Sequence, residues 1–267
     1  MLPFDKEKET LLITLYGKAV ESRRRRPMLA DAKAEEIVNR IDYDFKKLKI
    51  PAKTNTMMCL RAKLFDNFTR DFLDDRRDCA VLHPGCGLDS RYERIGRPAI
   101  EWYDLDFAEV IELRRQFFTE SVHYHLIPSS VTDAGWLAEI PTGKENYLVI
   151  AEGLFMYLVE DEIKALLQAL RKRIGRFTLI FDAYSKLTAR RVRHHPSLKR
   201  TGAQVHWGID DPGEIEQWLP GSRFIREIYF TDNPELANLG WGTRLLYKIA
   251  QLFPTARQAQ RILLYEL

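Results

Sequence analysis

Apolar positions in the first part of the chain recur with the spacing of amphipathic helices. Residues 5–24 and 31–40 each present one apolar side, and a third such stretch follows Pro51. In that stretch the apolar residues are three or four positions apart, the period of an α-helix: Met57, Leu60, Leu64, Phe68 and Phe72. These helices precede the first predicted strand. We therefore expect residues 1–76 to form an N-terminal helical cap.

Beyond residue 76 the pattern changes to short, nearly continuous apolar runs that alternate with helical patterns. Such runs are typical of strands buried on both faces of a parallel sheet that is covered by helices. The predicted strands are 79–84, 99–106, 122–128, 146–152, 177–183, 223–230 and 261–267. The predicted helices are 107–118, 133–139, 161–174, 186–194, 213–219 and 242–259. The pattern indicates an α/β core over residues 77–267, in one domain (1–267) with the cap.

Composition and charge narrow the class of protein. With 267 residues, 45% hydrophobic and 30% charged, the chain has the composition of a soluble globular protein and is long enough for a large core. The net charge of +3 is too small to indicate a nucleic-acid partner. The basic run Arg23–Arg26 fits a solvated helix end better than an anion site. No apolar run approaches the ~18 residues of a membrane span, and the charged N-terminus is unlike a signal peptide, so we expect a cytoplasmic protein.

The cysteines and histidines give little sign of a metal or a nucleophile. The three cysteines form no CxxC pair, which argues against a zinc site or a disulfide scaffold and fits a reducing compartment: Cys59, Cys79 and Cys86. We interpret Cys86 as a small buried residue rather than a nucleophile. His194, His195 and His206 lack the spacing of a metal-binding helix, so we expect no metal.

The first predicted strand ends in a glycine pair, in the run His83-Pro84-Gly85-Cys86-Gly87. Gly85 and Gly87 can adopt positive φ and allow a ligand to touch bare main chain. The pair lies at the carboxyl end of a strand, where open parallel sheets bind their ligands. Taken alone, the glycines also fit an ordinary turn from strand to helix.

The next predicted strand ends in two acids, Asp104 and Asp106. Asp104 follows Gly85 by 19 residues, and Asp106 follows Gly87 by 19. An acid near this spacing accepts hydrogen bonds from the hydroxyl groups of an adenosine ribose. Side chains two positions apart on a strand face the same way. The pattern predicts a nucleoside site, with a solvated acidic strand end as the alternative.

The residues after the glycine pair argue against a dinucleotide. A dinucleotide site needs a third glycine so that a helix N-terminus can cradle the pyrophosphate, but Gly87 is followed by Leu88-Asp89-Ser90-Arg91. We expect Asp89 to repel a pyrophosphate and to tolerate a cationic nucleoside without phosphates. S-adenosylmethionine is such a molecule, so the pattern favours it over NAD.

Three stretches together resemble the leucine carboxyl methyltransferase family. They are "GCGLDSRYERI", "YDLDFAEVIELRRQ" and "LVIAEGLFMYLVEDEIKALL". The family includes bacterial O-methyltransferases associated with polyketide biosynthesis. The resemblance implies a Rossmann-like class I methyltransferase, an α/β fold whose seven-stranded, mostly parallel sheet has its last-added strand antiparallel. Helices on both faces and an N-terminal helical cap are also implied.

The resemblance assigns cofactor contacts to the glycines and one acid. Gly85 and Gly87 fall beneath the methionine part of S-adenosylmethionine. Asp106 falls on the acid that holds the ribose, because it directly precedes the "AEVIEL" helix, and Asp104 is the second choice.

The remaining cofactor contacts come from other segments. The resemblance places Arg61 at the cofactor carboxylate, which a guanidinium fork grips at two points, and Glu152 near the cofactor's ammonium group. Ser130 and Val131 fall at the adenine. The family usually has Asp-Leu-Arg-Asp there, so residues 130–133 (Ser-Val-Thr-Asp) lack its first carboxylate.

Residues near the ends of later strands are candidates for acceptor contact. Their positions lie near the transferred methyl group or in a loop that can cover it: His83, Met156, Tyr157, Tyr184, His206 and Trp207. For His83 the alternative is a structural hydrogen bond, and for Met156, Tyr157 and Trp207 it is core packing.

The sequence therefore predicts an S-adenosylmethionine-dependent O-methyltransferase acting on a hydroxyl or carboxylate of a small molecule. One alternative is a protein that binds this cofactor without turnover, and another is a nicotinamide-dependent oxidoreductase. A carboxylate acceptor needs no general base, whereas a phenol would profit from one such as His83 or His206. No residue is nominated as catalytic, and the acceptor and the oligomeric state stay open.

Overall fold

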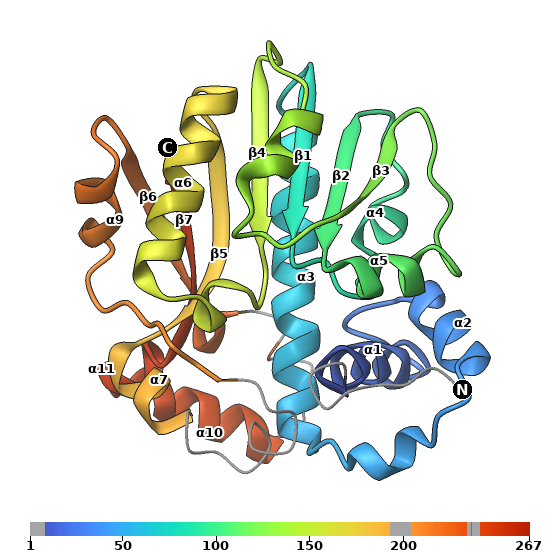
Figure 1. Cartoon of the computed structure of the whole chain (residues 1–267). Coiled ribbons are helices and arrows are strands. Elements are labelled where there is room, and N and C mark those ends of the chain that lie inside the picture. The colour runs from blue at the N-terminus through green and yellow to red at the C-terminus, as the bar shows by residue number, and fades with distance from the viewer. Residues whose placement is uncertain (1–8, 193–203, 234–235, 237–240) are drawn as a thin grey trace.

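A single seven-stranded sheet organises the part of the chain that the structure describes (Figure 1). This computed structural model describes residues 9–192, 204–233, 236 and 241–267. The strand order is β3-β2-β1-β4-β5-β7-β6. The strands are β1 (Cys79–Pro84), β2 (Glu101–Asp106), β3 (Tyr124–Pro128), β4 (Asn146–Ala151), β5 (Thr178–Tyr184), β6 (Arg223–Tyr229) and β7 (Gln260–Glu266). Only β7 runs antiparallel to its neighbours β5 and β6, which confirms the predicted fold class.

Helices cover both faces of the sheet in Figure 1. They are α1 (Glu9–Ser22), α2 (Ala32–Arg40), α3 (Ala52–Asp74), α4 (Arg91–Arg94), α5 (Ala108–Arg114), α6 (Glu160–Ile174), α7 (Lys186–Val192), α9 (Gly213–Trp218), α10 (Trp241–Gln251) and α11 (Pro254–Arg257). Short 3-10 turns are η1 (Phe45–Leu48), η2 (Ala134–Glu139), η3 (Phe155–Tyr157) and η4 (Phe230–Asp232). Among the described residues, no helix has the length and apolar character needed to cross a bilayer.

Some predicted helices differ from the observed ones. The stretch 242–259 is two helices, because Pro254 has no N–H to continue the first and instead begins the second. The helix predicted over 107–118 ends at Arg114. The residues predicted as a helix over 133–139 form the 3-10 turn η2. The predicted ends at residues 5–8 and 193–194 lie outside the described residues.

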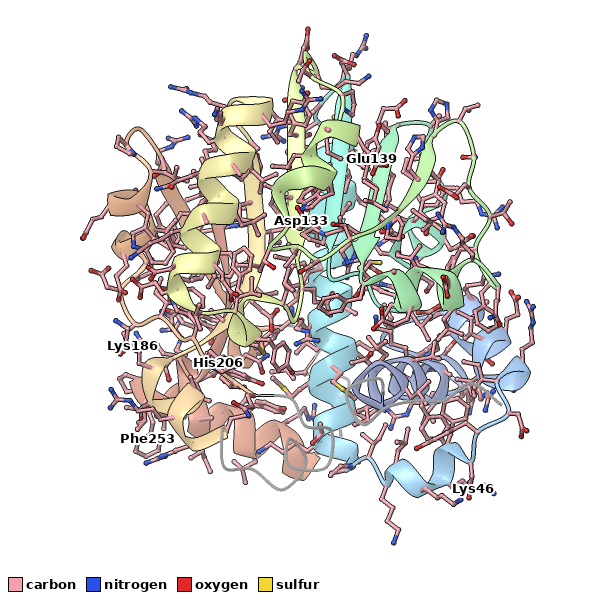
Figure 2. All side chains as sticks on the ribbon, viewed as in Figure 1. Lys46, Asp133, Glu139, Lys186, His206 and Phe253 are labelled. Atoms are coloured by element: carbon pink, nitrogen blue, oxygen red, sulfur yellow. The ribbon has the colours of Figure 1, made fainter. Side chains whose placement is uncertain are left out.

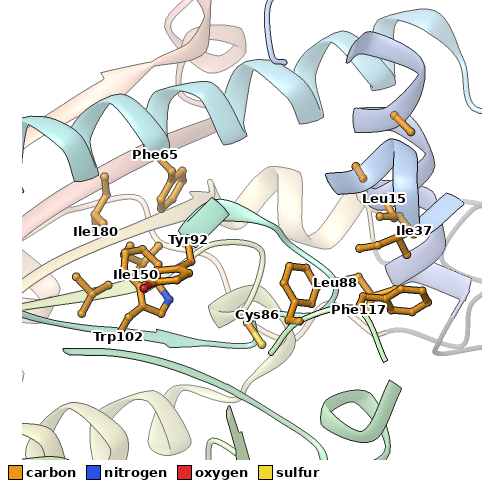
Figure 3. Close-up of a cluster of buried hydrophobic side chains, with 14 of the residues drawn as sticks. Leu15, Ile37, Phe65, Cys86, Leu88, Tyr92, Trp102, Phe117, Ile150 and Ile180 are labelled. Atoms are coloured by element: carbon orange, nitrogen blue, oxygen red, sulfur yellow. The ribbon is translucent and has the colours of Figure 1, made fainter. Parts of the chain in front are cut away.

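Alternate residues of each strand enter two different cores. Val81, Trp102 and Ile150 face the side covered by α3, where Phe65 packs beside them (Figure 3). Leu82 and its counterparts on the other strands face α6 on the opposite side. Every residue of β1 is buried, as expected for a central strand covered on both faces.

The N-terminal helices pack against the carboxyl end of β1. Leu15 and Ile37, from α1 and α2, join the same core as Leu88, which lies just after the glycine loop (Figure 3). Helix α1 also contacts α3. The first helices therefore lie beside the glycine loop. The division into residues 1–76 and 77–267 stays a prediction.

Candidate cofactor site and active site

The glycine loop after β1 adopts the backbone that the sequence predicts. Gly85 has φ +69° and Gly87 has φ +52°, a region that disfavours any residue with a Cβ. The space is also tight, because a Cβ on Gly85 would lie 3.0 Å from Leu154 Cδ1, and one on Gly87 would lie 2.9 Å from Leu11 Cδ2. The Gly85 N–H donates to the Leu105 carbonyl at 2.8 Å, which holds the loop against β2.

Asp106 lies at the end of β2, beside this loop. Its Oδ2 accepts a hydrogen bond from Gly87 N and its Oδ1 accepts one from Phe107 N, both at 2.8 Å. Burial raises the pKa of the Asp106 carboxyl, and these two N–H groups act against that rise. Each oxygen retains a second lone pair. The side chain is partly exposed and is therefore free to accept hydroxyl groups of a ligand.

Asp104 is fully buried, which makes the second choice for the ribose acid wrong. Its Oδ1 accepts hydrogen bonds from His83 Nδ1 at 3.0 Å and Trp102 Nε1 at 2.9 Å, and its Oδ2 accepts from Arg114 and Tyr124. Burial acts to raise its pKa, but Arg114 and His83 outweigh burial and hold the pKa at about 2. Asp104 therefore links β1, β2, β3 and α5 by hydrogen bonds, and neither of its oxygens is accessible to a ligand.

His83 has its predicted structural role rather than a role in acceptor binding. The side chain is 2% exposed, and both ring nitrogens face partners. Nε2 lies 3.2 Å from Arg91 Nη1, and since a guanidinium only donates, Nε2 must accept and Nδ1 must carry the proton donated to Asp104. His83 therefore cannot serve as a base for a phenol, and of the two predicted candidates only His206 is left.

Glu152 follows β4 and is held by two arginines. Its Oε1 accepts a hydrogen bond from Arg61 Nε at 2.9 Å, and its Oε2 accepts one from Arg91 Nη2. Burial acts to raise its pKa, but Arg91 and then Arg61 outweigh burial and hold the pKa at about 2. Glu152 is therefore an anion at neutral pH, as contact with an ammonium group requires.

Arg61 bridges the ends of two neighbouring strands. Its Nη1 donates to Asp182 Oδ2 at 3.0 Å, and Asp182 Oδ1 accepts from Gly153 N. Gly153 has φ +64°, and a Cβ there would lie 3.2 Å from Arg61 Nη2. Within the described residues, Nη2 has no hydrogen-bond partner. Arg61 therefore stands fixed between Glu152 and Asp182 with one nitrogen available for a carboxylate.

The segment that replaces a third glycine is bonded to the N-terminal helices. Asp89 Oδ1 accepts from Lys18 Nζ of α1 at 2.8 Å and from Arg94, and its Oδ2 lies 3.2 Å from Arg91 Nη2. Ser90 Oγ donates to Asp31, the N-cap residue of α2. Three cations thus neutralise Asp89. The expectation that Asp89 repels phosphates is wrong for that reason, and the absent third glycine is left as the argument against a dinucleotide.

Sequence reasoning missed a further set of ion pairs, in which two arginines bind one aspartate of α3. Asp66 of α3 accepts from Arg91 Nε at 2.9 Å and from Arg94 Nε at 2.7 Å. Arg91 and Arg94 both lie on the short helix α4, which the sequence pattern did not predict. The sequence does show a charged run, residues 89–94, between two apolar strands. The run alone does not show which residues its charges pair with.

The stretch after β3 is where the adenine was predicted. Ser130 Oγ lies 2.9 Å from Thr132 Oγ1, and Ser130 is partly exposed. Val131 is buried and lines a pocket of about 290 Å³ between η2 and α6. Asp133 Oδ1 accepts from Gly135 N at 2.9 Å and caps η2, so the carboxylate of this stretch is already engaged.

Three predicted acceptor residues gather at the ends of β4 and β5. Met156, Tyr157 and Tyr184 pack in one apolar cluster with residues of α7 and with Val205. Met156 is buried, while both tyrosines are partly exposed. Burial raises the pKa of Tyr157 and of Tyr184, so both hydroxyl groups stay protonated at neutral pH.

His206 and Trp207 have different surroundings. Both backbone N–H groups donate to the Met156 carbonyl, at 2.8 and 3.3 Å. The His206 side chain is exposed at the lower end of the sheet in Figure 2. Trp207 is 5% exposed and packs against Phe155 and Phe181. Its role is therefore core packing, which was the alternative to acceptor contact.

Comparison with known proteins decides the family. The family model described as "Leucine carboxyl methyltransferase" matches residues 12–171, which include Arg61, the glycine loop, Asp106 and Glu152. The chain belongs to the leucine carboxyl methyltransferase family. The resemblance found in the sequence is thereby confirmed. His194 and His195, which were considered for a metal, lie outside the described residues, and within these no cluster of metal-ligating side chains is present.

Two curated methyltransferases are similar along nearly the whole chain. The tetracenomycin polyketide synthesis O-methyltransferase TcmP of Streptomyces glaucescens is 37% identical, covering 96% of this chain and 95% of the relative. The S-adenosyl-L-methionine-dependent methyltransferase dpfgK of Gibberella zeae is 30% identical, covering 92% of this chain and 90% of the relative.

Solved structures share the fold at low sequence identity. A DUF574 family protein from Streptomyces avermitilis superposes with a TM-score of 0.61 at 9% identity, covering 96% of both chains. Magnesium protoporphyrin IX methyltransferase (ChlM) from Synechocystis, solved with bound S-adenosylhomocysteine, gives 0.51 at 14% identity, covering 88% of this chain and 93% of that one.

This member of the leucine carboxyl methyltransferase family is an S-adenosylmethionine-dependent O-methyltransferase. The predicted enzyme class and the predicted cofactor are confirmed. Because the family and its named relatives are methyltransferases, neither a binding protein without turnover nor a nicotinamide-dependent oxidoreductase has support.

Proposed function

We propose that this methyltransferase acts on a small aromatic molecule that presents a carboxylate. The observation that carries the proposal is the pair Tyr157 and Tyr184, two partly exposed phenols whose raised pKa keeps them as hydrogen-bond donors. The apolar cluster around them suits an aromatic body, since tyrosine rings stack on other rings. The relative TcmP is named for O-methylation in polyketide synthesis, which agrees with a small-molecule acceptor.

The residues at the strand ends fit the cofactor. We assign Gly85 and Gly87 to its methionine part, Asp106 to the ribose hydroxyl groups, Arg61 to the carboxylate and Glu152 to the ammonium group. A glycine loop with positive φ and no room for a Cβ, a partly exposed carboxylate and an arginine with one available nitrogen support these roles. Ser130 and Val131 are assigned to the adenine because they follow β3.

When bound, S-adenosylmethionine supplies a methyl group that forms a bond to the acceptor oxygen while the carbon–sulfur electron pair returns to sulfur. The protein's part is alignment and exclusion of water. The hydroxyl groups of Tyr157 and Tyr184 would donate to the acceptor carboxylate and orient one oxygen. Arg61 and Glu152 stay fixed in their ion pair and would bind the amino-acid end of the cofactor.

A carboxylate acceptor fits better than a phenol because the site offers few side chains that can accept a proton. A carboxylate of pKa near 4 is already ionised at neutral pH, while a phenol of pKa near 10 must lose its proton. His83 is buried with both ring nitrogens engaged, so it cannot take that proton. A phenol acceptor would therefore depend on His206, and this is the second candidate chemistry.

Matched acceptor pairs test the proposal. The enzyme is incubated with labelled S-adenosylmethionine and with aromatic acids and phenols of the same ring system, from pH 6 to 9. We expect carboxylates to be methylated at a rate nearly independent of pH, and Tyr157→Phe and Tyr184→Phe each to raise the acceptor KM. Methylation of phenols alone, at a rate that rises with pH and is lost in His206→Ala, would overturn the proposal.

We further propose that the enzyme acts in the cytoplasm, without a nucleic-acid or membrane partner. The three cysteines are buried and unpaired, as expected in a reducing compartment, and the net charge is only +3. The oligomeric state stays open.

A further inference from the structure

A segment remote in sequence holds the ends of β4 and β5. In residues 204–212, the N–H groups of His206 and Trp207 donate to the Met156 carbonyl, and the Ile209 N–H donates to the Tyr184 carbonyl at 2.9 Å. Val205 packs in the same apolar cluster as Met156 and Tyr184. The 204–212 segment therefore touches two of the proposed acceptor residues through both main chain and side chain.

Gly208 shows how closely this segment lies against the turn after β5. A Cβ at this position would lie 3.0 Å from the carbonyl oxygens of Tyr184 and Ser185 and 2.9 Å from the Ala189 side chain. The Lys186 N–H also donates to Asp210 Oδ1 at 2.9 Å. The segment has no space to move toward the turn, so its position depends on the bonds that keep it there.

Arg261 of β7 is also bonded to this segment. Its side chain is 1% exposed, and its Nη2 donates to the carbonyls of Ile209 at 3.1 Å and Asp210 at 2.8 Å. Its nearest carboxylate atom, Glu227 Oε2, lies 3.5 Å from Nε, and neither of these two atoms has a hydrogen-bond partner within the described residues.

The geometry of Arg261 favours a positioning role over a simple ion pair. A guanidinium that mainly neutralises a carboxylate adopts the two-point fork with short N···O distances. Here Glu227 is too distant for the fork. Nη2 donates to two main-chain carbonyls of the 204–212 segment, and Nη1 donates to the Gln258 carbonyl at 3.2 Å. Tyr265, on the same strand, adds a second hold because its hydroxyl donates to the Pro212 carbonyl at 2.8 Å.

We infer that Arg261 is a positioning residue for methyl transfer, acting through the 204–212 segment on the place where the acceptor binds. The inference rests on the acceptor site proposed above but not on whether the acceptor group is a carboxylate or a phenol. Loss of the hold would let Met156, Tyr184 and His206 shift, and an error of about 1 Å in placing a substrate costs up to about a hundredfold in rate. The proposed cofactor contacts are held by other partners: Asp106 by Gly87, and Arg61 and Glu152 by each other, Asp182 and Arg91. They should therefore not respond.

The test compares Arg261→Met, Arg261→Lys and Tyr265→Phe with the matched control Arg223→Met. Arg223 is an exposed arginine of neighbouring β6 that pairs with Glu266 and does not touch the 204–212 segment. Acceptor KM and kcat are measured with whichever acceptor the enzyme methylates. The dissociation constant for S-adenosylhomocysteine is measured separately by calorimetry.

We expect Arg261→Met to lower kcat/KM for the acceptor about ten- to a hundredfold, with the S-adenosylhomocysteine dissociation constant within about twofold. Arg261→Lys should recover part of the loss, since one ammonium can still reach a carbonyl. Tyr265→Phe should lower kcat/KM less, and Arg223→Met should change neither value.

Two results would overturn the inference. One is an unchanged acceptor kcat/KM in folded Arg261→Met. The other is a parallel loss of cofactor affinity, which would mean general destabilisation. If Arg261→Met does not fold, Tyr265→Phe decides, and an unchanged kcat/KM in that variant counts against the inference. Failure of carboxylate methylation refutes the proposed acceptor group alone, because the comparison uses any methylated acceptor.

Discussion

Gly87 and Asp106 are joined by a hydrogen bond of 2.8 Å from the glycine N–H to the aspartate Oδ2. The two residues are 19 positions apart, in different parts of the sequence motif. The bond makes the glycine loop and the acid one structural unit: the loop orients the carboxylate, and the carboxylate satisfies a main-chain donor that the turn leaves unpaired.

This unit predicts the effect of removing the acid. Asp106→Ala should weaken the binding of S-adenosylhomocysteine by about 2–4 kcal/mol, because charge-assisted hydrogen bonds to the ribose are lost. Isothermal calorimetry measures the dissociation constant. Glu109→Ala, an exposed acid on the following helix α5, is the control and should leave the constant unchanged. An unaltered constant in Asp106→Ala would count against the ribose assignment.

The glycine loop offers a matched pair of substitutions. Gly85 and Gly96 both have positive φ, +69° and +98°, so alanine at either position should cost about 1–2 kcal/mol of folding stability. A Cβ at Gly96 meets nothing within 4 Å, whereas Gly85 lies in the proposed cofactor loop. Thermal shift with S-adenosylhomocysteine should fall in Gly85→Ala only. An equal loss in both variants would show that strain alone is responsible.

Acid should destabilise the fold through Asp104 and Glu152. Each has a pKa near 2 in the folded protein, against about 4 in an unfolded chain. A lowered folded pKa gives stability that is present above pH 4 and lost as pH falls toward 2, on the order of 2 kcal/mol for each group.

Urea unfolding at pH 7, 5, 4 and 3 measures this loss. Asp104→Asn is the comparison variant, and it should be less stable at pH 7 by about 3–5 kcal/mol, because the buried charge of Arg114 loses its carboxylate partner. Its stability should also depend less on pH than that of the unaltered protein. Identical pH dependence of the two proteins would contradict the role given to Asp104.

Arg61 should not be replaceable by lysine. The guanidinium reaches Glu152 and Asp182 with two nitrogens and keeps a third, which a single ammonium cannot do. Arg61→Lys should weaken S-adenosylhomocysteine binding about ten- to a hundredfold, or about 1.4–2.8 kcal/mol. Lys53→Arg, at an exposed position of the same helix α3, is the control. Full affinity in Arg61→Lys would count against a contact between Arg61 Nη2 and the cofactor carboxylate.

Much of the fold was predictable because it depends on neighbouring residues. Continuous apolar runs located the strands, since a strand buried on both faces has no polar side. The helix 242–259 was less predictable, because its apolar spacing continues across Pro254 and only the missing N–H ends it. The four residues of α4 are too few to show a period.

The local arrangement of the candidate site was predictable where backbone freedom or motif spacing fixes it, as in the positive φ of Gly85 and Gly87 and in the place of Asp106 beside them. It was not predictable where the state of a charge depends on distant partners. The sequence alone could not show that Asp89 is neutralised, because Lys18 is 71 positions away. Nor could the spacing alone separate Asp104 from Asp106, which share a strand face and differ in what covers them; the family resemblance ranked Asp106 first, and the structure shows that Asp104 is buried.

The sequence by itself determined the order of the strands along the chain, the glycine turn and the class of cofactor, because these follow from local hydrophobicity, steric freedom and the motif. The tertiary structure alone decided which carboxylate is buried and which is open, and which strand holds the 204–212 segment. Burial and ion pairing depend on atoms that come together only when the whole sheet is assembled, and a pKa depends on the sum of all of them.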